Sequence, residues 1–124
     1  MNRELLEDVI VTALEGGSNY WYFINKENVS KIRSSVPKTV DPYLSTAILT
    51  AILDHGVEVQ INDLENKTEV LGVLSKERIK ERMEELYTNP KYKWAIQAHE
   101  EEGGDADSAD IVFQYLVMGD VWFG

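Results

Sequence analysis

The chain has 124 residues, carries a formal net charge of −10 and contains no cysteine. This length suits one domain with a single core, and no apolar run approaches the roughly 18 residues that a transmembrane helix requires. The lack of cysteine excludes disulfides and thiolate metal sites, and the first residues lack the pattern of a secretory signal. We therefore expect one domain over residues 1–124 that works in the cytoplasm and not at a membrane.

The negative charge lies mainly in the second half of the chain. Residues 1–62 sum to −3 and residues 63–124 sum to −7. Six acids occur between positions 100 and 110 with no base among them, which argues against direct binding to nucleic acid, because such binding depends on neutralising phosphates. The exception is a net +3 segment over residues 26–38, where a small anionic ligand could bind.

Apolar residues that recur at helical spacing between Leu5 and Leu14 predict a first helix. We expect Gly16 or Gly17 to end this helix in a left-handed conformation. The next segment is ambiguous, because residues 20–24 fit either a strand or a short buried helix, whereas residues 34–39 are typical of a loop.

A second, largely apolar helix is predicted to start at Asp41-Pro42 and to end at Gly56. The aspartate is the expected N-cap, and the proline suits the first helical position. Alternating residues at 57–61, turn residues at 62–66 and apolar or β-branched residues at 67–74 then predict a β-hairpin with one buried face.

Three further helices complete the prediction. We expect Ser75 to cap the first, Asn89-Pro90 to separate it from the second, and Asp105 or Asp107 to cap the third, which ends at Gly119. The whole pattern predicts a mainly helical α+β domain with about five helices and one β-hairpin.

The junction between the first helix and the aromatic block after it is the predicted ligand site. Two glycines permit close backbone approach, short polar side chains follow them, and aromatic rings suited to stacking come next. The alternative is a helix end followed by core aromatics, with two ordinary surface bases further on. The predicted ligand-binding residues are Gly16, Gly17, Ser18, Asn19, Tyr20, Trp21 and Tyr22, with Lys31 and Arg33 as phosphate contacts.

No pattern in the sequence predicts a catalytic centre, a metal site or a cofactor. His55 and His99 lack the spacing of zinc ligands, and the aspartates at 105–110 lack the glycine and the terminal glutamate of a calcium loop. No serine stands in a nucleophile motif. We therefore expect a protein that is not an enzyme, with no catalytic residue, no metal and no cofactor.

Short motifs stand near the two ends of the chain. The first is ALEGGSNYW at 13–21, and the second set is DSAD at 107–110, Gln114 and MGDVWFG at 118–124. Together they resemble a family of small uncharacterised proteins encoded by bacteriophages, while the middle of the chain resembles it poorly. The resemblance implies a phage gene product that acts in the cytosol of an infected bacterium, where such proteins often block host defence or redirect host machinery. No catalytic residue is carried over from that family to this chain.

The leading hypothesis is a phage-type accessory protein that captures a small nucleotide-like ligand, such as an immune signal, without turning it over. One alternative is an acidic, DNA-mimic-like inhibitor that binds a host defence protein, and another is a small nucleotide-signal hydrolase. The apolar segment Val121-Trp122-Phe123 is expected to pack beside the first helix or in a homo-oligomer interface, with the interface favoured.

Overall fold

The computed structural model describes residues 2–124, and within them six α-helices, one π-helical turn and a three-stranded antiparallel sheet. The mainly helical α+β fold predicted from the sequence is confirmed, with one helix more than expected. None of the helices in this range is both long and apolar enough to cross a membrane. The elements are α1 (Arg3–Thr12), η1 (Ala13–Gly17), β1 (Tyr22–Phe23), α2 (Lys26–Ser35), α3 (Leu44–His55), β2 (Val59–Asp63), β3 (Val70–Leu74), α4 (Lys76–Thr88), α5 (Lys93–Glu100) and α6 (Ala106–Met118).

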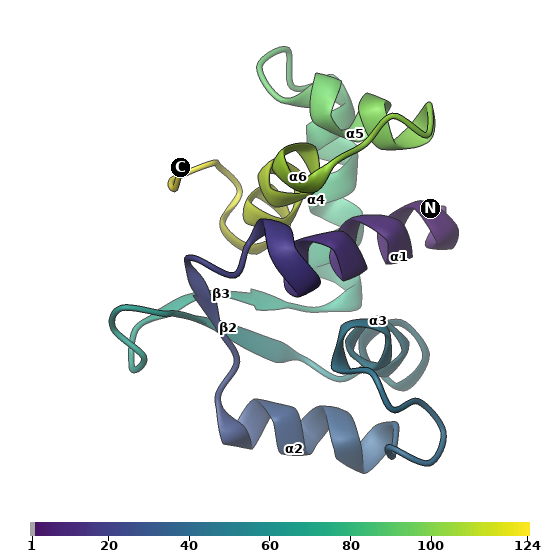
Figure 1. The fold of residues 1–124 in the computed structure, drawn as a ribbon, viewed down its shortest axis with the longest axis vertical. Coiled ribbons are helices and arrows are strands. Elements are labelled where there is room, and N and C mark those ends of the chain that lie inside the picture. Colours follow the sequence, from purple (N-terminus) through teal and green to yellow (C-terminus); the bar gives the residue numbers. More distant parts are fainter. Residues whose placement is uncertain (1) are drawn as a thin grey trace.

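Helix α6 is the centre of the molecule. It contacts α1, η1, α4, α5 and β3, and nine of its thirteen residues are buried. In Figure 1, α1 and α6 lie on one side of the β2–β3 ribbon and α2 lies on the other. The predicted hairpin is present as β2 and β3, and β1 adds a short third strand through the pairs Tyr22↔Asp63 and Phe23↔Asn62. Side chains on the buried faces of α6 are therefore packed against several different helices and strands.

The first helix does not end on a left-handed glycine, so that expectation is wrong. Neither Gly16 nor Gly17 has a positive φ, and the helix instead widens into the π-helical turn η1. A Cβ at Gly17 would lie 2.4 Å from the carbonyl oxygen of Ala106. The close backbone approach expected of the glycines is thus present at Gly17, where it brings η1 against the first turn of α6.

The ambiguous segment after the aromatic block contains α2, which the sequence did not predict. Asn25 caps this helix by accepting a hydrogen bond from the backbone N–H of Asn28, at 2.9 Å. The Asn28 side chain in turn accepts a bond from the N–H of Gln60 in β2, at 2.8 Å. This bond ties α2 to β2, and Ile32 of the same helix is buried in the core.

The large apolar helix begins later than expected. Tyr43 is the N-cap of α3, so Pro42 stands before the helix and not at its first position. Asp41 still stabilises the start, because its carboxylate accepts bonds from the N–H of Tyr43 at 3.1 Å and from the hydroxyl of Thr46 at 2.6 Å. The expected stop is confirmed, since Gly56 has φ = 67°.

The remaining helix ends follow the predicted caps. Ser75 caps α4, Asp105 caps α6, and Gly119 ends α6 with φ = 73°. Asn89-Pro90 does separate two helices, but α5 begins only at Lys93 because Asn89 accepts backbone bonds from Lys91 and Tyr92 in the intervening turn.

Candidate functional site

The predicted ligand site centres on Trp21, and this residue lies in the core. Its side chain is buried, with 2% of the residue's surface exposed. The Phe123 ring stacks on the indole at a centroid distance of 5.4 Å and an interplanar angle of 11°, and the Phe113 ring packs at 5.5 Å. Trp21 therefore has no free ring face for a ligand while Phe123 is in place.

A buried carboxylate holds the aromatic block against α6. Asp110 Oδ1 accepts hydrogen bonds from the Ser18 hydroxyl at 2.8 Å and from the Trp21 indole N–H at 2.7 Å. Its Oδ2 accepts from the Tyr20 hydroxyl and, at 3.1 Å, from the Gln114 amide. Burial and the bond to Asp110 raise the pKa of Tyr20 well above its usual range. Four donors thus satisfy a carboxylate that has no cation beside it among the described residues.

Gln114 fixes the C-terminal segment, residues 120–124, on the same cluster. Its Oε1 accepts from the backbone N–H groups of Trp122 and Phe123, both at 2.9 Å, and its amide donates to the carbonyl of Phe123 at 3.1 Å. The segment therefore packs on Trp21 and α6, while Trp122 itself is 68% exposed. The motifs that stand near the two ends of the sequence meet in this one cluster.

The structure separates the other residues of the predicted site. The Tyr22 hydroxyl donates to the carbonyl of Leu14 at 2.8 Å, and Gly16, Asn19 and Lys31 are exposed. The Arg33 guanidinium donates to the carbonyls of Asp41 at 2.5 Å and Pro42 at 3.1 Å, which ties α2 to the start of α3. Gly17 and Tyr20 lie together beside Asp110, but neither predicted phosphate contact joins them.

A recess lies beside the Asp110 cluster, and we call it the tail recess. Its volume is about 470 Å³. It is bounded by η1, the first turns of α6 and the C-terminal segment, and its lining residues are Gly17, Tyr20, Asp107, Asp110, Ile111, Val121, Phe123 and Gly124. Of the predicted site, Gly17 and Tyr20 contribute to this recess.

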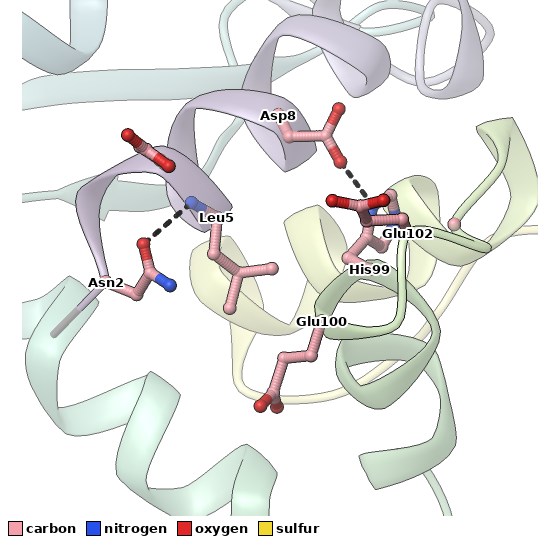
Figure 2. A pocket seen from close by; sticks show the side chains of 8 residues that line it. Asn2, Leu5, Asp8, His99, Glu100 and Glu102 are labelled. Carbon is pink, nitrogen blue, oxygen red and sulfur yellow. Dashed lines mark hydrogen bonds and ion pairs between the residues drawn. The ribbon is translucent and has the colours of Figure 1, made fainter.

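A second recess lies between the start of α1 and the end of α5, and we call it the acidic recess. Its volume is about 370 Å³, and Figure 2 shows Asp8 reaching into it from α1 while Glu100 and Glu102 come from the end of α5 and the loop after it. Four carboxylates and one histidine stand among its lining residues, and neither lysine nor arginine does. The lining consists of Asn2, Glu4, Leu5, Asp8, His99, Glu100, Glu102 and Gly104.

His99 forms the floor of the acidic recess. Its Nδ1 lies 2.8 Å from Asp8 Oδ2 and its Nε2 lies 3.0 Å from the Ser108 hydroxyl. The Asp8 carboxylate, the His99 imidazole and the Ser108 hydroxyl thus form a chain of contacts in the same order as the catalytic triad of serine hydrolases. However, Ser108 is 1% exposed, does not line the recess, and accepts the Asp105 N–H in the capping box of α6. The geometry gives this serine a capping role and offers no route to a substrate, so it does not favour the hydrolase alternative.

Glu102 occupies a strained conformation at the rim of the acidic recess. Its φ is 59°, and it is the one residue other than glycine with positive φ in the described range. The left-handed region costs such a residue roughly 1–2 kcal/mol, and glycine is the usual choice after a helix. Strained positions of this kind are common at functional sites.

Sequence reasoning missed the acidic recess. Two signals pointed towards it: His99 falls on the apolar face of α5 with Ala95 and Ile96, and Asp8 stands between the buried residues Leu5 and Val9 on α1. Neither signal shows that Asp8 and His99 lie in contact, because α1 and α5 are far apart in the sequence.

Comparison of the chain with known protein families, with curated protein sequences and with solved structures gave no match.

Proposed function

We propose that the protein acts by binding, and that the acidic recess receives a cationic group from a partner protein. The supporting observation is the recess itself, in which four carboxylates surround a space of about 370 Å³ without a neutralising lysine or arginine. Complementary charge accelerates encounter and selects the partner. A lysine or arginine side chain inserted here would relieve the repulsion among these acids.

The strain at Glu102 supports the same proposal. A glycine at this position would remove the conformational cost, yet the chain has a carboxylate there, directly before two glycines. Stability given up at one position commonly serves function. The resemblance to phage proteins predicts that the partner belongs to the host, which stays a prediction.

A labelled synthetic peptide of alternating arginine and serine tests the proposal by fluorescence anisotropy on the full chain. We expect saturable binding that weakens at least about tenfold when NaCl rises from about 50 to about 500 mM. The variant Glu100→Gln/Glu102→Gln should weaken binding by about tenfold or more. Glu101→Gln is the matched control, since Glu101 lies between them in sequence but does not line the recess.

Two outcomes would contradict the proposal. One is that the double variant and the Glu101→Gln control weaken peptide binding equally, which would indicate non-specific attraction of the peptide to the net charge. The other is the absence of any peptide binding at low salt.

Capture of a nucleotide-like ligand is the second candidate function. The supporting observation is the tail recess, because it contains Gly17 and Tyr20 of the predicted ligand site and its volume lies in the range of small-molecule pockets. The test is to purify the protein from bacteria, denature it by heat and analyse the released small molecules by mass spectrometry. A nucleotide or nucleoside released in amounts close to that of the protein supports capture, and its absence after incubation with a nucleotide pool opposes it.

A further inference from the structure

The tail recess has rigid aromatic walls. Phe123 is fixed by its stack on Trp21 and by the Gln114 bonds to its backbone, and Tyr20 is fixed through its hydroxyl. Tyr20 as a whole residue is nevertheless 48% exposed. A ligand that stacks here would not have to order flexible side chains, and such ordering is a large part of the cost of binding.

The polar rim of the tail recess is acidic. Asp107 is exposed and its carboxylate has no hydrogen-bond partner within residues 2–124, so it is free to accept bonds from a ligand. Asp110 adds a second carboxylate at the floor, and the lining includes no lysine or arginine. Two carboxylates would repel a phosphate group, whereas hydroxyl or amino donors would find an acceptor.

The remaining surface is apolar or lacks a side chain. Ile111 and Val121 supply aliphatic contacts, while Gly17 and Gly124 add backbone and no side chain. Apolar walls with a few convergent polar groups are the usual composition of a small-molecule site.

From these three features we infer that the tail recess binds a planar aromatic ligand whose rim carries hydroxyl or amino donors and which has no phosphate group, such as a nucleoside. The ring stacks against Tyr20 and Phe123, and the donors bond to Asp107. The inference rests on the second candidate function and narrows its ligand from nucleotides to their unphosphorylated relatives. Lys31 and Arg33 take no part, because neither lines this recess.

The test uses the full chain and three kinds of probe: the four common ribonucleosides, their 5′-monophosphates, and the aromatic amine tryptamine. Binding is measured by calorimetry, and for the nucleosides and their monophosphates also by tryptophan fluorescence, since Trp21 stacks on a wall of the recess. We expect at least one nucleoside to bind at least about tenfold more tightly than its monophosphate. Asp107→Asn should weaken that binding at least about fivefold, and Glu101→Gln, an exposed acid outside the recess, should not change it.

The possible failures are distinguishable. A monophosphate that binds more tightly than its nucleoside would overturn the inference and leave ligand capture at another site intact. Saturable binding of tryptamine that depends on Asp107, without nucleoside binding, would support the recess as a site for donor-bearing rings while opposing capture of a nucleotide-like ligand. No saturation by any probe below about 10 mM would overturn both.

Discussion

Trp21 is the residue whose role changes most between sequence and structure. Its burial between Phe113 and Phe123 predicts that Trp21→Ala costs roughly 3–5 kcal/mol of unfolding free energy, enough to unfold a marginal domain. Tyr43→Ala is the control, because that residue is largely exposed and its side chain makes no capping bond, so its removal should change stability by less than about 0.5 kcal/mol. Urea titration followed by circular dichroism measures both. A Trp21→Ala protein as stable as the control would show that the ring is not part of the core.

Glu102 offers a direct comparison of stability with binding. Glu102→Gly should raise the unfolding free energy by about 1 kcal/mol, because glycine adopts the left-handed conformation without steric cost. The same change removes a carboxylate from the acidic recess and should weaken binding of the basic peptide. Thermal melts and anisotropy on one preparation test both effects. A less stable variant would oppose the strain argument, and unchanged peptide affinity would oppose a role for Glu102 in the recess.

Ionisation of Tyr20 in the Asp110 cluster should make the stability of the protein depend on pH in the alkaline range. Its pKa is higher in the folded protein than in the unfolded chain, so its contribution to stability is fully present below about pH 10 and is lost as pH rises beyond that. Burial also raises the pKa of Tyr22, and burial with a bond to Glu100 raises that of Tyr87 to about 12. The protein should therefore lose stability above about pH 10, and Tyr20→Phe should show a shallower loss than wild type. Urea midpoints at several alkaline pH values measure the slopes, and equal slopes would contradict the assignment.

At the scale of elements, the two adjacent glycines of η1 have different roles. A Cβ at Gly17 meets the backbone carbonyl of Ala106, whereas a Cβ at Gly16 meets nothing within 4 Å and φ there is not positive. Gly16→Ala should therefore stabilise the protein by about 0.4–1 kcal/mol, and Gly17→Ala should destabilise it by more than about 1 kcal/mol. Melting temperatures of the pair decide the point. Two equal shifts would mean that η1 does not press against α6.

Local signals predicted most helix ends and the hairpin. Ser75, Asp105, Gly56 and Gly119 act where expected because a cap depends on residues within one turn. Helix α2 was missed because its stabilisation includes the bond that Asn28 accepts from the N–H of Gln60 in β2, which no local pattern contains.

The candidate sites were less predictable than the elements. The aromatic block could be located, but its burial depends on Asp110, about ninety residues away. Gly17 and Tyr20 do line a recess, while the acidic recess needs α1 and α5 to meet through Asp8 and His99. Partners that distant are fixed by tertiary packing and not by spacing along the chain.

At the scale of the whole molecule, the homo-oligomer stays a prediction, and substitution of Trp122 tests it. This ring is large and exposed, as aromatic anchors of an interface are before assembly. We expect light scattering to give a mass above that of the 14.1 kDa chain, and Trp122→Ser to return it to the monomer. A wild-type monomer at high protein concentration would contradict the interface, as would an unchanged mass in the variant.

The Asp110 cluster also bears on how the molecule is made. Ser18 and Trp21 are synthesised long before Asp110 and Phe123, from which they are separated by roughly ninety to one hundred residues. Because a ribosome adds about 5–20 residues per second, the indole ring waits for several seconds without its acceptor or its stacking partner. During that interval the aromatic block lacks its native packing, and transiently exposed hydrophobic surface of this kind is prone to aggregation. The final fold can close only when α6 and the segment after it have left the exit tunnel.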